Sequence, residues 1–327
     1  MSSKIYKTVV VLGTGGTIAG TAATPGDNIG YTAAQVGVAQ LLAGMPALTQ
    51  LPCTLLVEQV AQVDSKDMDF AVWQALAARV GHFLALPEVQ GVVITHGTDT
   101  LEETAYFLHA VLPAEMLARK PVVLTCAMRP STAMAPDGPQ NLLDACAVVL
   151  TQGACGVLAV CAGTVHGAVD VQKVHPYRLD AFNSGDAGPL GFVEENSVRL
   201  MRNWHFAHVG IQQFAIVNIA NLKHWPRVEI VMSHAGASGA MVDALLAQAA
   251  TDCGDPVRGI VVAATGNGTV HQALEAALVR AQAGGVKVVR ATRCTEGRVL
   301  PVANGLFPDS QGLSPVKARI ALMLSLL

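Results

Sequence analysis

The chain has 327 residues, of which 51% are hydrophobic, 14% charged and 5% aromatic, with a formal net charge of -3. This length suits about two domains with a large buried core. The slightly acidic balance gives no basic surface for nucleic acid, and the few aromatic residues argue against stacking of single-stranded bases. We therefore expect a globular protein that does not bind nucleic acid.

A mean hydropathy of +0.42 calls for a check for membrane spans. The best candidate is the uncharged stretch 145–165, but Gln152 and several glycines interrupt it. It is better explained as the end of a helix, a turn at Gln152-Gly153 and a buried strand at 156–161. The N-terminal residues show no long apolar segment and no small-residue cleavage site, so no secretory signal is expected. We predict a cytoplasmic protein without membrane association.

Along the chain, runs rich in Val and Ile alternate with Ala- and Leu-rich segments of helical pattern. Strands are predicted at 8–12, 54–60, 91–95, 121–126 and 156–161, and helices between them at about 33–43, 67–85, 101–118 and 139–151. Strands without polar alternation are typical of a parallel sheet covered on both faces.

The pattern loosens from about Asn183 and then resumes. The second part has predicted strands at 228–232, 259–263 and 286–291, and predicted helices at 239–251 and 270–282. The sequence therefore predicts an α/β protein with a larger N-terminal parallel-sheet domain at 1–203, a linker at 204–225 and a smaller C-terminal α/β domain at 226–327.

Seven cysteines are scattered along the chain, with no CxxC pair and no Cys/His cluster of zinc-binding spacing. Most lie in apolar runs, as at Leu124-Thr-Cys126 and Ala159-Val-Cys161. Buried reduced thiols are a simpler interpretation than a metal site or disulfides.

A glycine-rich loop, Gly13-Thr-Gly-Gly-Thr-Ile-Ala-Gly20, follows the first predicted strand. It is not a dinucleotide-binding fingerprint, because Ile18 occupies the third glycine position. Such a loop can expose backbone N–H groups that bind an oxyanion, and Thr17 would lie beside them. Residues 24–30 have the composition of a mobile loop, and Tyr31 at its end could close over a site. A tight turn and a surface tyrosine would also explain these features.

The second polar loop, His96-Gly-Thr-Asp-Thr-Leu-Glu-Glu103, follows the third predicted strand. Loops at the carboxyl ends of parallel strands line one crevice, so Thr98 and Asp99 are expected near Thr17. Residues Thr100 to Glu103 match a capping box, which accounts for neither Thr98 nor Asp99.

Two further polar clusters follow strands. Asp64-Ser-Lys-Asp67 comes after the second predicted strand and, on its own, would be a helix cap formed by Asp64 or Ser65. The segment 165–175 contains Lys173, and an isolated lysine there is most simply a solvated surface residue.

Together these loops resemble one family. The segments Gly15–Gly20 and Val93–Phe107 resemble the two signatures of bacterial-type L-asparaginases, including the glutaminase-asparaginases. The second signature is long enough to be highly specific. The likeness spans nearly the whole chain, through 121–124, 127–132, 137–142, 170–173, 188–191, 266–268 and 315–319.

The resemblance implies a role for each matching residue. Thr17 corresponds to the acyl-accepting nucleophile, and Tyr31 to the lid tyrosine that hydrogen-bonds it. Thr98, Asp99 and Lys173 correspond to a second catalytic group, in which Thr98 positions the hydrolytic water.

The same resemblance implies the substrate contacts and the assembly. Ser65 and Asp99 would hold the α-carboxylate and α-ammonium of the substrate. Asn267 would reach a neighbouring site across an intimate dimer interface, and such dimers would pair into a homotetramer. No metal or organic cofactor is implied.

The implied reaction is hydrolysis of L-asparagine to L-aspartate and ammonia through an ester on Thr17, with L-glutamine as a slower substrate. One alternative is a glutaminase-asparaginase of broader specificity. Another is the ammonia-supplying subunit of a tRNA-dependent amidotransferase, which would carry an extra N-terminal domain. A binding module that keeps the fold without catalysis is a third.

Three positions depart from the family pattern. Lys66 stands where secreted members commonly carry Gln or Glu, and it would repel the substrate ammonium unless it points outward. Val169 stands where many members have Arg, so a local ion pair is expected to be missing. The segment 295–314 is shorter than in members that contribute a glutamate to the neighbouring site.

Overall fold

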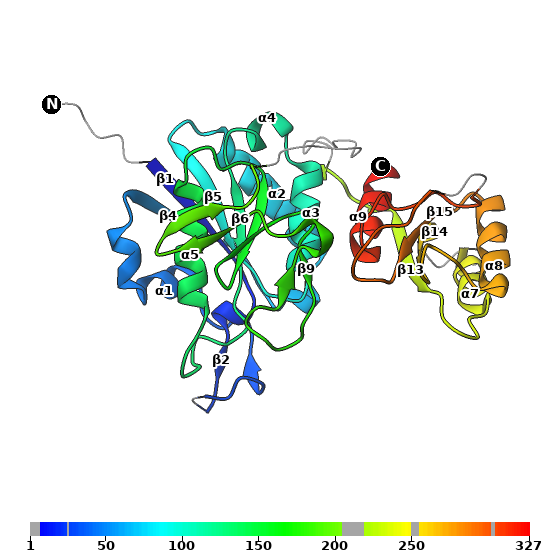
Figure 1. Ribbon diagram of the computed structural model, residues 1–327, viewed down its shortest axis with the longest axis horizontal. Helices are drawn as coiled ribbons and strands as arrows, with labels where there is room; N and C mark the ends of the chain where they lie inside the picture. The colour runs from blue at the N-terminus through cyan, green and yellow to red at the C-terminus, as the bar shows by residue number, and fades with distance from the viewer. Residues whose placement is uncertain (1–6, 25, 205–218, 250–254, 302–304) are drawn as a thin grey trace. The chain divides into compact units, whose positions relative to one another are not determined.

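The computed structural model describes residues 7–24, 26–204, 219–249, 255–301 and 305–327 (Figure 1). The chain divides into two compact units, Met1–Asn221 and Leu222–Leu327. The expected linker at 204–225 falls mostly on 205–218, which lie outside the described residues. The boundaries expected at 203 and 226 therefore stay a prediction.

The N-terminal unit is built on an eight-stranded sheet of order β12-β11-β8-β7-β6-β5-β1-β4. Each of the five predicted strands of this unit is present. Strands β1, β4, β5, β6 and β7 run parallel, and β8, β11 and β12 extend the sheet in antiparallel pairing. The bounds are β1 (Lys7–Gly15), β4 (Cys53–Val63), β5 (Val89–Thr95), β6 (Val122–Thr125), β7 (Val157–Cys161), β8 (Thr164–Gly167), β11 (Gly191–Glu194) and β12 (Ser197–Leu200).

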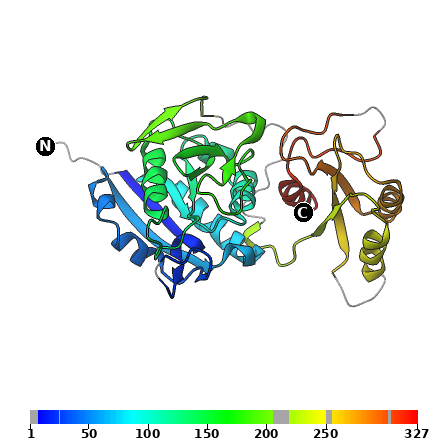
Figure 2. The same cartoon turned by 60° about the horizontal axis from the view of Figure 1, so that its bottom comes forward.

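The antiparallel edge was not predicted. Its three strands have four residues each, which is too short for an alternating pattern to be recognised. Glu195 and Asn196 form the turn between β11 and β12 with φ angles of 47° and 61°, without a glycine to mark it. In Figure 2 this green hairpin lies at the edge of the sheet opposite the blue strand β4.

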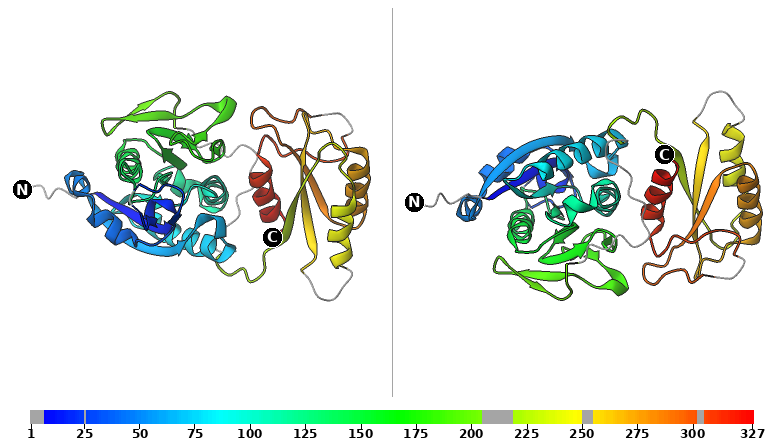
Figure 3. Two further views of the ribbon diagram at one scale, coloured as in Figure 1. Left: turned by 90° about the horizontal axis from the view of Figure 1, so that it is seen from below. Right: turned by 90° about the horizontal axis from the view of Figure 1, so that it is seen from above.

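Helices cover both faces of this sheet (Figure 3). Helices α1 (Val38–Ala43) and α5 (Gly138–Leu150) pack on one face, where alternate strand residues such as Val9, Val11 and Val93 meet them. Helices α2 (Phe70–Ala85) and α3 (Leu101–Val111) pack on the other, where the rings of Trp73 and Phe107 stack at 4.7 Å. The sheet is therefore buried on both faces, as its unbroken apolar strands predicted.

Two predicted helices differ from the structure. The helix predicted at 101–118 is divided into α3 and α4 (Ala114–Leu117), because Pro113 has no N–H to continue the helical ladder. The helix predicted at 33–43 begins only at Val38. Ala34 instead has a φ of 56°, and its N–H donates to Gly16 O, so this segment runs along the glycine-rich loop.

Short elements carry most of the polar loops. They are η1 (Thr17–Ala19), β2 (Thr21–Ala22), β3 (Tyr31–Thr32), η2 (Pro46–Gln50), η3 (Ser65–Asp67), β9 (Gln172–Lys173), β10 (Phe182–Asn183) and η4 (Gly185–Ala187).

The C-terminal unit has a parallel sheet of order β13-β14-β15, with bounds Arg227–Met232, Val257–Ala264 and Lys287–Thr292. Helices α7 (Ala240–Ala249) and α8 (Gln272–Ala283) cover one face and α9 (Pro315–Ser325) covers the other (Figure 3). The α/β class and the large-plus-small arrangement are thus confirmed. Helix α9 was not predicted, although Pro315 after Ser314 is a typical helix start.

The uncharged stretch 145–165 contains the end of α5 and strand β7, as the glycine and glutamine interruptions indicated. None of the helices in the described parts of the chain is long and apolar enough to cross a bilayer. The cysteines that the structure describes are free thiols, and Cys126, Cys146 and Cys161 are buried. Burial raises the pKa of Cys146 to about 12, so this thiol stays protonated. Cys253 lies outside the described residues.

Candidate active site

The loops that follow β1 and β5 touch through Gly16 and Gly97. The two strands are parallel neighbours, so both loops leave the same edge of the sheet. A side chain at Gly16 would overlap the Cα and N atoms of Gly97, and the φ of 80° at Gly16 is one that glycine adopts without strain. Thr17 and Thr98 directly follow these glycines, so the contact brings the two threonine-bearing loops together.

Thr17 begins the single turn η1 and is buried, with 6% of its surface exposed. Its Oγ1 lies 2.7 Å from the hydroxyl oxygen of Tyr31. Tyr31 comes from β3, which pairs with β2 in a short antiparallel hairpin, so a phenol and an alcohol from separate elements are hydrogen-bonded. Gly16 N donates to Val63 O, and this removes one N–H from the group that the glycine-rich sequence offered to an oxyanion.

Thr98, Lys173 and Asp99 form a second hydrogen-bonded group. Lys173 Nζ donates to Thr98 Oγ1 at 2.8 Å and to Asp99 Oδ1 at 2.6 Å. The Lys173 side chain is 16% exposed, whereas that of Asp99 is 53% exposed. The carboxylate is therefore open to a ligand, while the ammonium is enclosed beside the threonine.

The backbone around Lys173 is fixed by contacts from two directions. Lys173 stands on β9 opposite Phe182 of β10, and its N–H donates to Glu102 Oε1 at 3.3 Å. Glu102 is buried in the first turn of α3. The sequence did not single out Glu102; its position three residues after Asp99 at a helix start was the available signal.

Ser65 connects the loop after β4 to the loop after β5. Its Oγ accepts from Asp99 N at 3.2 Å, and its carbonyl accepts from Thr100 Oγ1 at 2.8 Å. Because Ser65 Oγ acts as an acceptor there, its own O–H remains available as a donor. The capping box expected at Thr100 is wrong, because the Thr100 hydroxyl bonds to Ser65 instead of to the helix N-terminus. Asp64 does cap, accepting from Lys66 N at 3.3 Å.

Lys66 forms an ion pair with the adjacent Asp67, and its side chain is 61% exposed. The hydrogen bond that Lys66 Nζ donates to the Asp67 carboxylate raises the Lys66 pKa, so the amine remains charged. Its charge is neutralised locally by Asp67, and the lysine extends into solvent. Beside Val169, the Asp170 carboxylate lies 3.8 Å from the Arg202 guanidinium.

His96 directly precedes Gly97, the glycine that contacts Gly16, and is fully buried. Its Nδ1 donates to Gly97 O at 2.7 Å, while its Nε2 has no hydrogen-bond partner among the described residues. Burial lowers the His96 pKa to about 4, so the ring is neutral at pH 7. A neutral ring therefore supports the backbone that precedes Thr98.

Asn267 belongs to the C-terminal unit, in the turn between Thr265 and Thr269. Its Oδ1 accepts from Leu300 N at 2.7 Å, which leaves the amide N–H₂ group as the donor that it can offer to a ligand.

The N-terminal unit carries six of the seven expected residues, Thr17, Tyr31, Ser65, Thr98, Asp99 and Lys173.

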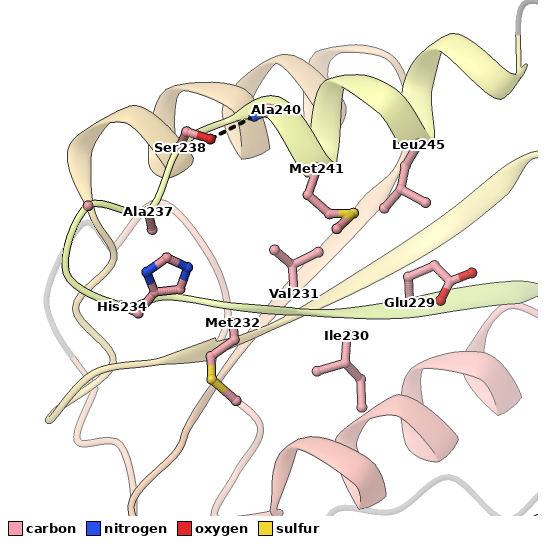
Figure 4. Close-up of a pocket in the computed structure, with 11 residues that line it drawn as sticks. Glu229, Ile230, Val231, Met232, His234, Ala237, Ser238, Ala240, Met241 and Leu245 are labelled. Carbon is pink, nitrogen blue, oxygen red and sulfur yellow. Dashed lines mark hydrogen bonds between the residues drawn. The ribbon is translucent and has the colours of Figure 1, made fainter.

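A separate groove in the C-terminal unit is apolar (Figure 4). It lies between β13 and α7 and is lined by side chains such as Val231, Met232, Met241 and Leu245. His234 is at one end and Glu229 at the other, without a nucleophile and base in contact. This groove lacks the paired polar groups of the threonine loops.

Comparison with known proteins matches both units. A family model described as "Asparaginase, N-terminal" matches residues 8–206, and one described as "Glutaminase/Asparaginase C-terminal domain" matches residues 227–327. The glutaminase-asparaginase of Pseudomonas fluorescens biotype A is 37% identical over 327 residues, covering 97% of this chain and 86% of that protein. L-asparaginase 2 of Escherichia coli K12 is 36% identical over 328 residues, covering 97% and 88%.

Among solved structures, a probable cytoplasmic L-asparaginase from Campylobacter jejuni superimposes with a TM-score of 0.88. The match covers 98% of this chain and 95% of that chain, at 36% sequence identity. The fold is thus shared over nearly the full length of both chains.

Proposed function

The chain belongs to the bacterial-type asparaginase and glutaminase family of amidohydrolases, and from that premise we propose that it hydrolyses L-asparagine to L-aspartate and ammonia through an ester on Thr17. One observation carries the proposal. Two loops in backbone contact each present a threonine hydroxyl with its own proton-exchanging partner, Tyr31 at 2.7 Å for Thr17 and Lys173 at 2.8 Å for Thr98.

In the first half-reaction, Thr17 Oγ1 attacks the carbon of the side-chain amide. A threonine hydroxyl is a weak nucleophile at neutral pH and needs a group that takes its proton. Tyr31 lies at hydrogen-bond distance and relays that proton toward the leaving nitrogen. The C–N bond breaks, ammonia leaves, and the acyl group remains as an ester on Thr17. Backbone N–H groups of the loops hold the oxyanion, with about 3–4 kcal/mol per donor in comparable enzymes.

In the second half-reaction, water attacks the ester carbon and regenerates the threonine. Thr98 accepts a hydrogen bond from the Lys173 ammonium and lies 3.4 Å from Asp99 Oδ1, so its hydroxyl is oriented by both charges. A hydroxyl held in this way can position the attacking water, whose proton ends on the Thr17 oxygen as the ester C–O bond breaks.

The substrate's own charges are matched by the same elements. The half-exposed Asp99 carboxylate suits the α-ammonium, and the O–H of the buried Ser65 suits the α-carboxylate. We propose that Asn267 completes the site of a neighbouring protomer with its amide N–H₂, in an intimate dimer that pairs into a homotetramer. A cytoplasmic location is proposed as well, supported by the name of the Campylobacter jejuni protein.

The second candidate is a glutaminase-asparaginase of broader specificity, and the 37% identity to the Pseudomonas fluorescens protein of that name favours it. Ammonia release from L-asparagine and L-glutamine, measured side by side with purified protein, separates the two. We expect asparagine to be the faster substrate. An equal kcat/KM for glutamine would establish the broader activity, and no release from either would overturn both candidates and favour a binding module.

A reactive amino-acid analogue of the substrate tests the nucleophile directly. Peptide mapping by mass spectrometry should find the covalent adduct on the peptide that contains Thr17. A label on Thr98 alone would reverse the assigned order of the two threonines.

A further inference from the structure

The hairpin that carries Tyr31 is held from outside by the loop after β6. Ser131 N and Ser131 Oγ both donate to Gly20 O, at 3.0 and 2.7 Å. Thr132 Oγ1 accepts from Ala22 N at 2.9 Å. One loop, residues 128–137, therefore makes three hydrogen bonds to two residues, Gly20 and Ala22, which follow the Thr17 turn.

The residues that these bonds hold are in turn bonded to Thr17 or paired with Tyr31. Gly20 ends the turn η1, and its N–H donates to Thr17 O at 2.8 Å. Ala22 is the cross-strand partner of Tyr31 in the β2–β3 hairpin. Ser131 thus fixes the exit of the Thr17 turn, and Thr132 fixes the strand opposite Tyr31.

The 128–137 loop is itself firmly anchored. Asp137 accepts from Met128 N and Arg129 N, both at 2.9 Å, and from Asn141 Nδ2 at 3.2 Å. Asn141 also donates to Cys126 O at 2.9 Å, which ties α5 to the end of β6. The loop is therefore a rigid support that projects from the central sheet toward the two-stranded hairpin.

Outside its own pairing, the hairpin is held on the β3 side by the N–H groups of residues 34–36, which donate to Gly16 O and Ala19 O. Strands β2 and β3 have two residues each, and a hairpin of this size is not stable by itself. The loop at its tip is exposed, with Ile29 at 81%. The β2 side, which faces Tyr31 across the strand pair, is held by the 128–137 loop through Ser131 and Thr132.

We propose that Ser131 and Thr132 are positioning residues, which set the distance between the Tyr31 and Thr17 hydroxyls by holding strand β2. This inference rests on the proposed roles of Tyr31 and Thr17 in catalysis. A displacement of about 1 Å can cost two orders of magnitude in rate, so a bond that fixes the strand opposite Tyr31 matters although it touches no substrate.

The principal test compares T132V with T132S. Valine keeps the shape of threonine but cannot accept from Ala22 N, whereas serine keeps the hydroxyl. We expect T132V to lower kcat for asparagine by about tenfold to a hundredfold with a smaller change in KM, and T132S to keep most of the activity. T49V is the matched control, since the Thr49 hydroxyl is exposed and bonds only to Pro46 O within its own turn.

A double-mutant cycle with Y31F separates positioning from a general loss of stability. If Thr132 acts through Tyr31, T132V should change the rate of the Y31F enzyme by less than about twofold. Multiplicative losses, or a wild-type kcat in T132V, would overturn the inference.

Hydrogen exchange gives a readout independent of turnover. Thr132 is exposed, so T132V should fold, and the peptide that covers β2 and β3 should exchange faster than in wild type and T49V. Unchanged exchange in this peptide would overturn the inference even if activity fell. A Y31F enzyme with wild-type kcat would instead refute the proposed role of Tyr31, whatever the exchange result.

Discussion

Gly16 and Gly97 lie backbone against backbone, so a β-carbon on Gly16 would overlap the main chain of Gly97. The contact joins the two loops that carry Thr17 and Thr98. A β-carbon on Gly97 would in turn overlap the Ser65 side chain. Three loops therefore meet where only hydrogen atoms fit between them, and the separation of the two threonines is set by this packing.

Alanine at Gly16 should separate the loops. We expect Gly16→Ala to lower kcat/KM by at least about a hundredfold, because it displaces Thr17 from its partners. It should also cost about 1–3 kcal/mol of stability, since the φ of 80° is strained for alanine. Steady-state kinetics and thermal unfolding measure the two effects.

Gly188→Ala is the matched control. Gly188 has a φ of 67° but nothing within 4 Å of an added β-carbon, so this variant bears the backbone strain without a collision. It should lose stability and keep its activity. If Gly16→Ala and Gly188→Ala were equally active, the contact between the loops would have no catalytic importance.

Removal of either threonine hydroxyl should stop turnover while the fold remains. We expect Thr17→Ala and Thr98→Ala each to lower kcat by several orders of magnitude, about 10⁴-fold or more, as for nucleophile and base variants of other hydrolases. Circular dichroism and the thermal midpoint should stay close to wild type, since each change deletes a single small group. Thr17→Ser, which keeps a hydroxyl, should retain measurable activity; near-wild-type rates in either alanine variant would refute its role.

The sequence predicted the parallel strands and the loops at their carboxyl ends, because both depend on local signals, namely unbroken Val/Ile runs and the polar clusters after them. Partners such as Glu102 and Lys173, or Ser65 and Thr100, are 71 and 35 residues apart. Such contacts depend on how α3 and β9 pack, which no local pattern encodes. The Thr100 capping box failed for this reason: its hydroxyl donates to the distant Ser65 carbonyl and accepts no hydrogen bond from the first turn of α3.

The family resemblance indicated the site residues but not the state of Lys66. Its ion pair with Asp67 involves a neighbour in sequence, yet a flexible lysine beside Asp64 and Asp67 has several possible partners. The structure shows that its partner is Asp67, which lies with it in η3.

The Lys66–Asp67 pair leads to a prediction about substrate binding. Asp67→Asn should release the Lys66 charge and raise KM for asparagine several-fold, because an unpaired ammonium next to Ser65 repels the substrate's α-ammonium. Since both side chains are mostly exposed, salt should weaken the effect. Lys66→Gln in the Asp67→Asn background should restore the wild-type KM. An unchanged KM in Asp67→Asn at low ionic strength would show that Lys66 lies too far from the substrate to matter.

Assembly should determine whether Asn267 can act. If its amide serves a neighbouring protomer, Thr17→Ala and Asn267→Ala chains should complement each other when co-expressed. A mixed dimer then contains one site with an intact Thr17 and an intact Asn267 from the partner, so each mixed dimer, once purified, should have about half of the wild-type activity. On its own, Thr17→Ala should be inactive and Asn267→Ala only weakly active. Mixed dimers as inactive as the Thr17→Ala protein would place Asn267 in the site of its own chain, or outside it.

His96 should make the protein sensitive to mild acid. Its folded-state pKa is about 4, against 6.5 for an unburied histidine, because burial disfavours the charged ring. Between these values the unfolded chain binds a proton that the folded chain does not, so stability is lost as pH falls from 6.5 towards 4 and is regained as pH rises. The shift corresponds to about 3 kcal/mol across this window.

Thermal midpoints measured at intervals from pH 7.5 down to about 4.5 should therefore fall more steeply in wild type than in His96→Asn. The asparagine amide can still donate to Gly97 O, so the variant removes the titration and keeps the hydrogen bond. Asp144 acts in the opposite direction: burial raises its pKa, so its contribution favours the folded state as pH falls. Because Asp144 is present in both proteins, its effect cancels in the difference between the two curves. Parallel curves for wild type and His96→Asn would mean that the ring titrates in the folded protein as it does in the unfolded chain, and the lowered pKa assigned to the buried ring would then be wrong.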